Sequence, residues 1–236
     1  MPPTILVLWD VDHTLMETGG VGSEIYASAF EKVTGRALEQ MADTFGRTEP
    51  VIFRETLQVN GIEDPGDLFA AFAEEQARGY AERADEMRQR GQALPGAANA
   101  LRVLASHDEL TQSVLTGNTR PSAEIKLRTF GLDKHLDLDI GAYGTDDDIR
   151  AHLVDIARQR ATQRTGHRFG QETTVLIGDT PSDVIAARDG SARIIAVATG
   201  RDSADALAAA GADTVLADLT STAAVLAAIY PGEPPQ

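Results

Sequence analysis

Short runs of apolar residues alternate, along most of the chain, with segments in which apolar residues recur every three to four positions. An apolar run that ends in a polar or glycine-rich turn predicts a buried strand, and the helical period predicts an amphipathic helix. The predicted strands are residues 5–9, 113–115, 175–177, 194–197 and 214–216. The predicted helices between them are residues 97–105, 123–130, 149–164, 182–188 and 204–210. This alternation predicts an α/β fold, a Rossmann-like parallel sheet with helices on both faces.

One long segment, residues 17–94, breaks the alternation because it contains helical pattern only. Apolar residues from Ile25 to Val33 predict one helix, and Pro50 opens a second. Asp64-Pro65 is typical of a helix start and predicts a third helix that runs to about Arg90. The sequence therefore predicts a helical cap domain (17–94) inserted after the first strand of an α/β core domain (1–16 and 95–230). The proline-rich tail, 231–236, is expected to be disordered.

The composition narrows the function classes. Of 236 residues, 36 are Asp or Glu and 21 are Lys or Arg, a net charge of -15 that argues against nucleic-acid and anionic-membrane partners. The chain has no cysteine, which excludes disulfides, thiolate metal sites and cysteine nucleophiles. The first apolar run is too short for a membrane span or a signal sequence. We expect a cytoplasmic protein, and nothing in the pattern indicates its oligomeric state.

Acidic residues follow two of the predicted strands. Asp10 and Asp12 come directly after the first strand, and an extended backbone would point both side chains the same way. Asp179 follows the strand at 175–177, and Asp183 lies in the first turn of the next helix, where it could simply stabilise the helix start. Asp10 and Asp12 could equally be solvated turn residues.

A third strand ends in Thr116-Gly117-Asn118, which could bind a phosphate through hydroxyl and backbone N–H groups or could simply be a turn. In an open α/β sheet, ligands bind at the carboxyl ends of the strands. Because all three acidic or polar segments follow strands of one predicted sheet, we expect them to meet in a single site.

In these motifs the chain resembles the haloacid dehalogenase superfamily, and the resemblance covers nearly the whole chain. The first family motif, Asp-x-Asp-x-Thr, is matched by Asp10, Asp12 and Thr14. The second, a strand that ends in Thr or Ser, is matched by Thr116. The fourth, an acidic pair after a strand, is matched by Asp179 and Asp183. The helical insert stands where many members carry a cap, and the chain looks most like the phosphoglycolate-phosphatase-like members.

The resemblance implies a magnesium-dependent phosphatase that acts on a small phosphorylated metabolite. Asp10 would attack phosphorus and form an aspartyl phosphate, and Asp12 would serve as general acid and then general base. Mg²⁺ would be held by the carboxylates of Asp10 and Asp179 and by the backbone carbonyl of Asp12, with Asp183 acting directly or through water. Gly117 and Asn118 would help to bind the substrate.

The third family motif is a basic residue, for which the chain offers two candidates. Arg150 has the expected position at the start of a helix, and Lys126 is the alternative, in the helix after Thr116. In the cap, Arg47 follows Gly46 in a loop before Pro50, and it would bind a substrate carboxylate or second phosphate unless it is an ordinary exposed arginine. His13 stands where the family often has glycine, and we assign it no role.

Three other functions share parts of this pattern. A phosphomutase would use the same core residues and return the phosphoryl group to a sugar phosphate. A 2-haloacid dehalogenase would use Asp10 on carbon and leave Asp12, Asp179 and Asp183 idle, which argues against it. A non-catalytic binding module on this scaffold would be expected to have lost the nucleophile or the metal ligands, and both are present.

Overall fold

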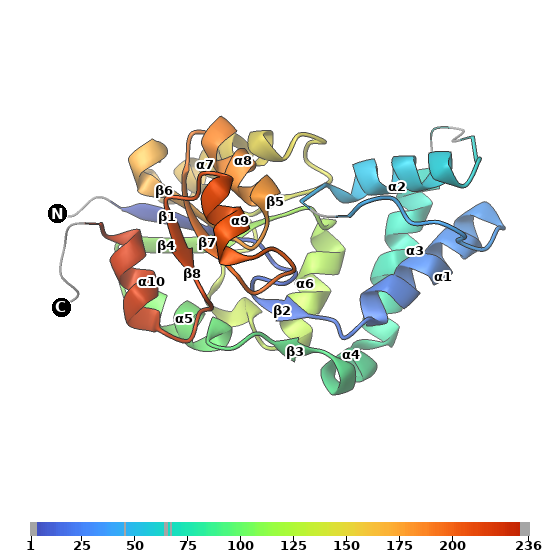
Figure 1. The fold of residues 1–236 in the computed structure, drawn as a ribbon, viewed down its shortest axis with the longest axis horizontal. Helices are drawn as coiled ribbons and strands as arrows, with labels where there is room; N and C mark the ends of the chain where they lie inside the picture. Colours follow the sequence, from blue (N-terminus) through green and yellow to red (C-terminus); the bar gives the residue numbers. More distant parts are fainter. Residues whose placement is uncertain (1–3, 45, 64–65, 67, 232–236) are drawn as a thin grey trace.

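The central element of the fold is a six-stranded parallel sheet (Figure 1). A computed structural model describes residues 4–44, 46–63, 66 and 68–231. The strands, in the order in which they lie side by side, are β5 (Ala142–Tyr143), β4 (Leu110–Thr116), β1 (Ile5–Trp9), β6 (Thr174–Gly178), β7 (Arg193–Val197) and β8 (Thr214–Leu216). The predicted α/β fold is therefore confirmed.

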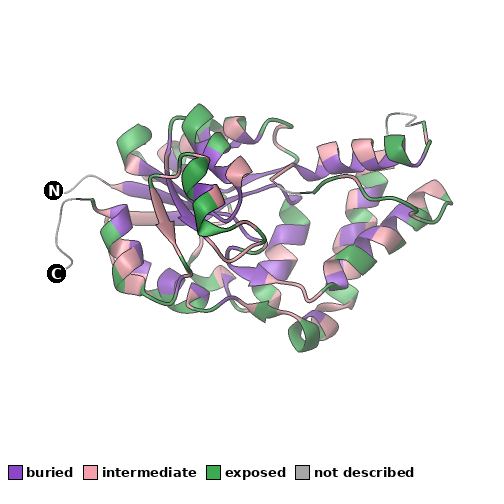
Figure 2. Ribbon diagram, viewed as in Figure 1, coloured by how far each residue is buried: buried purple, intermediate pink, exposed green. Residues whose placement is uncertain are grey.

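Helices cover both faces of the sheet, so that most of its strand residues are buried, whereas those of the edge strand β8 are half-buried (Figure 2). One face packs against α5 (Ala97–Leu104), α6 (Arg120–Thr129) and α10 (Thr222–Ile229), and the other against α7 (Arg150–Thr165) and α8 (Pro181–Asp189). Strand β1 shows why its apolar run is continuous: Val7 and Trp9 enter the first core, while Leu6 and Leu8 enter the second. The remaining core helix, α9 (Ala204–Ala209), lies next to β8.

Four helices form a second body beside the sheet: α1 (Val21–Thr34), α2 (Glu49–Val59), α3 (Leu68–Glu82) and α4 (Ala84–Arg90) (Figure 1). Their hydrophobic cluster is aromatic, with Phe53 stacked on Phe72 at 4.4 Å between ring centroids and Tyr26 edge-on to Phe72 at 4.8 Å. We call these helices the cap. The exact boundaries at residues 17 and 94 stay a prediction.

The two connections between the sheet domain and the cap pair with each other. Strand β2 (Met16–Glu17) runs antiparallel to β3 (Gln92–Ala93), an element that the sequence pattern did not predict because each strand has only two residues. Next to this pair, Gly19 has a φ of +60°, and a Cβ there would lie 2.2 Å from the carbonyl oxygen of Arg90. A side chain at position 19 would therefore push the connections apart.

The sequence-based boundaries differ from the structure in several places. The third cap helix is not continuous to Arg90: it breaks at Arg83, whose φ of −104° and ψ of 18° are not helical, and Met87 of α4 then packs with Tyr80 of α3. Strand β4 starts at Leu110, and α6 starts at Arg120 because the side chain of Thr119 caps it. Strand β5 and helix α10 were not predicted. The expectations for Asp64-Pro65 and for residues 232–236 lie outside the described residues.

In the described part of the chain, no helix combines the length and the apolar character needed to cross a membrane.

Candidate active site

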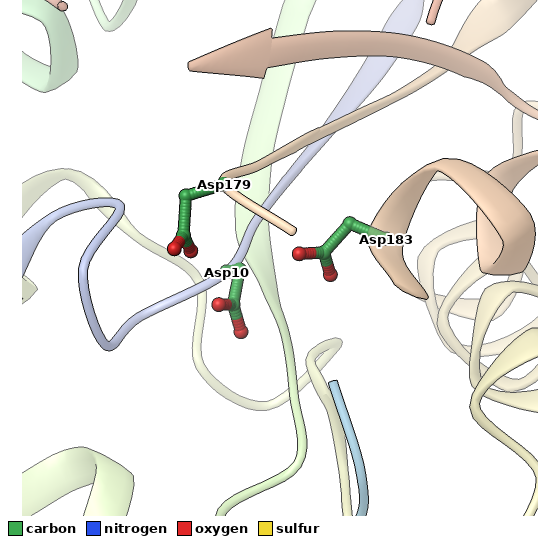
Figure 3. A group of neighbouring side chains, drawn as sticks. All are labelled: Asp10, Asp179 and Asp183. Carbon is green, nitrogen blue, oxygen red and sulfur yellow. The ribbon is translucent and has the colours of Figure 1, made fainter. Parts of the chain in front are cut away.

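Three buried carboxylates meet at the carboxyl edge of the sheet (Figure 3). Asp10 follows β1, Asp179 follows β6, and Asp183 lies in the first turn of α8. One oxygen from each carboxylate lies within 4.8 Å of the others. The convergence expected from the strand ends is therefore present, because β1 and β6 are neighbours in the sheet.

Local hydrogen bonds hold each of the three aspartates in place. The backbone N–H of Asp10 donates to the carbonyl of Ile177 at 2.8 Å, which continues the sheet pairing beyond β1. Thr14 donates its hydroxyl proton to Asp179 at 3.0 Å. The backbone N–H and the hydroxyl group of Thr180 donate to Asp183 at 3.1 and 2.7 Å, so Asp183 is also part of the cap of α8. Its role in starting the helix and its place in the cluster are compatible.

The crowding of these carboxylates raises two pKa values. Burial raises the pKa of Asp10 to about 7, against the opposing charge of Arg150. Burial, together with the charges of Asp10 and Asp183, raises the pKa of Asp179 to about 8. When such neighbouring carboxyl groups are all ionised, their negative charges repel one another. A bound cation would offset this repulsion.

Arg150, the first residue of α7, joins two members of the cluster. Its guanidinium group donates to Asp10 at 2.8 Å and to Asp183 at 2.6 and 3.0 Å, and only 9% of its surface is exposed. The helix start places the arginine here because α7 packs against α8, which carries Asp183. The position predicted for Arg150 therefore brings it to the cluster.

Asp12 is held apart from the cluster by a second cation. The ammonium group of Lys126 donates to both of its carboxylate oxygens, at 2.9 and 3.0 Å, and the Asn118 side-chain amide donates at 2.7 Å. Burial pushes the pKa of Asp12 upward, but the charge of Lys126 and these hydrogen bonds outweigh it and leave the pKa below its usual value. The sequence offers Arg150 and Lys126 as alternatives for one basic residue. The structure brings both into the site, each beside a different carboxylate.

Thr116 and Gly117, at the end of β4, lie between Asp12 and the cap. The Asn118 side chain donates to the Thr116 hydroxyl at 2.8 Å. The carbonyl of Gly117 accepts the backbone N–H of Glu49, the first residue of α2, at 2.8 Å. A Cβ at Gly117 would lie 2.1 Å from the carbonyl oxygen of Arg47, so glycine is needed for the cap loop to pass this close.

A cavity of about 230 Å³ separates the carboxylates from the cap. The core side of its lining includes every sequence-predicted site residue of the sheet domain except Asp183, and the cap side includes Arg47. Arg47 forms an ion pair with Glu55, and both side chains are more than one-third exposed. His13 also lines the cavity, with a φ of +60°, and its carbonyl accepts a hydrogen bond from the Thr199 hydroxyl at 2.6 Å.

Glu49, Gln76 and Tyr80 are among the cap residues that line this cavity and that the sequence did not indicate. Glu49 precedes Pro50 and therefore looked like an ordinary acidic residue at a helix start. Gln76 and Tyr80 recur four residues apart on α3, a spacing that marks one helix face and cannot say what the face meets.

The residues of the cluster fit a divalent metal ion. Asp10, Asp179 and Asp183 offer hard carboxylate oxygens, which suit Mg²⁺, and the raised pKa values of Asp10 and Asp179 show carboxylates that a cation would stabilise. The Asp12 side chain is not part of this group and forms an ion pair with Lys126.

We expect Mg²⁺ to stabilise the protein more at high pH than at low pH. In the folded metal-free protein, Asp10 and Asp179 keep their protons to about pH 7 and about pH 8, far above the ordinary value of 3.8. Between the ordinary pKa of 3.8 and about pH 8, the folded state therefore binds more protons than the unfolded state. The free energy of unfolding falls as the pH rises through this range. Mg²⁺ binds the deprotonated carboxylates, so the gain in Tm over chelator should be larger at about pH 8 than at about pH 6.

Thermal unfolding with Mg²⁺ and with chelator, at both pH values, measures this difference. Asp179→Asn should remove most of the Mg²⁺ effect, whereas Asp205→Asn, which changes an exposed aspartate on α9, should not. An equal gain in Tm at both pH values would contradict the assignment.

We expect Arg150 and Lys126 to contribute differently to turnover. Arg150→Ala removes the cation beside Asp10, so kcat should fall by about 10²-fold or more on every phosphate ester. Lys126→Met removes the cation beside Asp12, so its cost should depend on how much protonation the leaving group needs. Steady-state rates on an aryl and an alkyl phosphate distinguish the two, and equal losses for Lys126→Met on both esters would contradict its assignment to Asp12.

The chain resembles known proteins in sequence and in fold. The family model for haloacid dehalogenase-like hydrolases matches residues 7–188. A hydrolase from Pseudomonas syringae is 20% identical, covers 94% of this chain and 97% of its own, and superposes with a TM-score of 0.66. A predicted phosphoglycolate phosphatase from Haemophilus somnus 129pt is 15% identical over 96% of this chain and 99% of its own, with a TM-score of 0.67.

A proposed β-phosphoglucomutase from Thermotoga maritima is 21% identical over 94% of this chain and 98% of its own, with a TM-score of 0.58. No curated protein matches the sequence significantly. At these identities the solved structures support the fold, and the family model, which matches most of the chain, supports the family. The chain belongs to the haloacid dehalogenase-like hydrolases.

Proposed function

We propose that the protein is a magnesium-dependent phosphatase that hydrolyses a small phosphomonoester through an aspartyl-phosphate intermediate. The observation that carries the proposal is the separation of two neighbouring carboxylates into different environments. Asp10 lies with Asp179, Asp183 and Arg150, whereas Asp12 lies with Lys126 and Asn118, and both line one cavity. Carboxylates in different environments can take different roles in one reaction.

In the first step, a carboxylate oxygen of Asp10 attacks the phosphorus atom and the bond from phosphorus to the leaving oxygen breaks. Asp12 is ionised in the free protein because Lys126 and Asn118 keep its pKa low, and the negative charge of a phosphate ester bound beside it raises that pKa. With the substrate bound, Asp12 carries a proton and gives it to the leaving oxygen, so that a neutral alcohol departs. The products of this half-reaction are the alcohol, phosphorylated Asp10 and ionised Asp12. Lys126 and Asn118 are placed to stabilise ionised Asp12.

In the second step, a water molecule attacks the phosphorus atom of phosphorylated Asp10. Asp12 takes a proton from this water, and the bond between phosphorus and the Asp10 oxygen breaks. Inorganic phosphate leaves, and both aspartates return to their starting protonation states. One water is consumed for each ester that is cleaved.

The other residues bind and orient the phosphoryl group. Asp10, Asp179 and Asp183 would hold Mg²⁺, with the backbone carbonyl of Asp12 as a further ligand. The bound ion supplies positive charge that offsets the repulsion between an anionic nucleophile and an anionic phosphate. Arg150 adds charge beside Asp10. Thr116, Gly117 and Asn118 would contact the phosphoryl oxygens from the end of β4.

The substrate is expected to be small because the cap contacts the core around the cavity. In addition to the Glu49–Gly117 hydrogen bond, the Ser122 hydroxyl donates to Gln76 at 3.2 Å and Arg54 forms an ion pair with Asp148 at 2.5 Å. A phosphoglycolate-like ester is the substrate that the family resemblance suggests, and a sugar phosphate is the substrate of a mutase. These molecules share the phosphoryl group and differ in the part that faces the cap.

Phosphate release from an aryl phosphate, measured with Mg²⁺ and with excess chelator, tests the proposal. We expect hydrolysis with the metal and almost none with the chelator. Hydrolysis that persists in chelator would exclude the metal-dependent route. Halide release from a haloacid would favour a dehalogenase, and phosphoryl transfer between sugar phosphates without net phosphate release would favour a mutase.

A further inference from the structure

The cations that line the cavity are already matched by carboxylates. Its arginine and lysine residues are Arg47, Lys126 and Arg150. Arg47 pairs with Glu55 on α2, Lys126 with Asp12, and Arg150 with Asp10 and Asp183. A substrate carboxylate that entered the cavity would have to displace one of these partners to gain a cation. For Lys126 and Arg150, which are buried, this displacement is costly because it leaves a charge in the site without a counter-ion.

The cap adds a carboxyl group to this lining. Glu49 is 8% exposed, and its Oε1 accepts a hydrogen bond at 2.8 Å from the Gln76 side-chain amide, which is neutral. Burial raises the pKa of Glu49 against the opposing charge of Lys126. Glu49 lines the cavity, so its carboxyl group can accept a further hydrogen bond from a ligand. The surroundings that already resist the charge of Glu49 would resist a second carboxylate more strongly.

Three contacts hold Glu49 in place. Its backbone N–H donates to Gly117 at 2.8 Å, so Glu49 sits directly beside the phosphate-binding end of β4. The Ser122 hydroxyl donates to Oε1 of Gln76, which turns the amide nitrogen of Gln76 toward Glu49. A carboxyl group fixed in this way can accept a hydrogen bond from a ligand without losing much side-chain entropy.

The remaining cap side of the cavity is rich in groups that hydrogen-bond to neutral molecules. Besides Glu49 and Gln76 it contains five hydroxyl-bearing residues and two apolar ones. They are Thr18, Ser23, Tyr26, Thr44 and Tyr80, together with Met41 and Ile52. Hydroxyl, amide and carboxyl groups next to apolar surface suit an alcohol with several hydroxyl groups.

We propose, on the basis of the phosphatase activity proposed above, that Glu49 selects phosphomonoesters whose leaving group carries neutral hydroxyl groups and rejects those that carry a carboxylate. Glu49 acts by accepting a hydrogen bond from a substrate hydroxyl and by adding a carboxyl group to a lining whose arginine and lysine residues are already paired. The sequence led us to expect that Arg47 binds a substrate carboxylate, whereas this proposal has the neighbouring Glu49 reject one. The guanidinium group of Arg47 is already paired with Glu55.

The matched pair of glycerol 3-phosphate and 3-phosphoglycerate tests the proposal, because these esters differ only in a CH₂OH group against a carboxylate. We expect the wild-type protein to favour glycerol 3-phosphate by about 10-fold or more in kcat/KM. Glu49→Gln keeps the size of the side chain and removes its ability to ionise, so the ratio of the two kcat/KM values should fall several-fold. The ratio cancels any loss that both substrates share.

Two further variants make the result specific. Glu31→Gln changes an exposed glutamate on α1 outside the cavity and should leave the ratio unchanged. A preference for 3-phosphoglycerate that Arg47→Ala abolishes would assign selection to Arg47 and overturn the proposal. A ratio that Glu49→Gln leaves intact, or no reaction with glycerol 3-phosphate, would also overturn it. Failure of the phosphatase activity itself would appear separately, as no magnesium-dependent hydrolysis of the aryl phosphate.

Discussion

Asp10→Asn should lower phosphatase turnover by several orders of magnitude and leave the protein folded. The amide keeps the size of the side chain and its hydrogen-bond acceptor for Arg150, but it cannot act as the nucleophile, and nothing else in the site replaces it. Removing one of three crowded carboxylates should also relieve repulsion in the metal-free protein. The variant should therefore unfold at no lower temperature than the wild type in chelator.

Steady-state phosphate release and thermal unfolding measure the two effects on the same preparation. Asp205→Asn, on the exposed side of α9, is the matched control and should keep wild-type turnover. Wild-type protein quenched during turnover should carry a phosphoryl group on the peptide that contains Asp10. Turnover by Asp10→Asn within an order of magnitude of wild type would rule out the aspartyl phosphate.

Asp12→Asn should lower kcat on an alkyl phosphate by about 10²–10⁴-fold, because an alkoxide leaving group needs the proton that we assign to Asp12. The loss should be much smaller on an aryl phosphate, which leaves without that help. The asparagine also leaves the Lys126 cation without its carboxylate partner, so some loss of stability is expected.

The role of Asp12 is tested by comparing how far Asp12→Asn lowers kcat on the alkyl phosphate and on the aryl phosphate. A structural defect would lower both rates equally, whereas the loss of a general acid acts on the alkyl ester. Asn118→Ala provides a second test, since it removes a hydrogen bond to Asp12 and retains the carboxylate. Undiminished alkyl-phosphate turnover by Asp12→Asn would contradict the general acid assignment.

The sequence predicted the part of the site that is built from strand ends. A continuous apolar run such as residues 5–9 predicts a strand of a parallel sheet that is covered on both faces. The aspartate that follows this run then lies at the carboxyl end of the strand, where ligands bind in such sheets. The same argument places Asp179 after β6. Arg150 could be placed because it opens a helix that packs beside the one that starts with Asp183.

The contacts between distant segments could not be predicted in this way. Lys126 binds Asp12 across 114 positions of sequence, and the helical period of α6 gives the face of the lysine without saying what that face meets. Glu49 lies at the cavity because the first residue of α2 hydrogen-bonds through its backbone N–H to Gly117. A backbone contact of this kind cannot be recognised from the residue types. Strand β5 and the β2–β3 pair have two residues per strand, too few for an alternation to be visible.

The pairing of β2 with β3 has a consequence for how such a protein can change. Met16 lies beside Ala93, so the chain leaves the sheet domain and returns to it at neighbouring points. A segment whose two ends meet can be exchanged for another without stretching the scaffold that receives it. In this sense the cap is a separable module, and the carboxylates to which we assign the chemistry stay with the sheet domain. Replacing the cap would then change which leaving groups are accepted and leave these carboxylates in place.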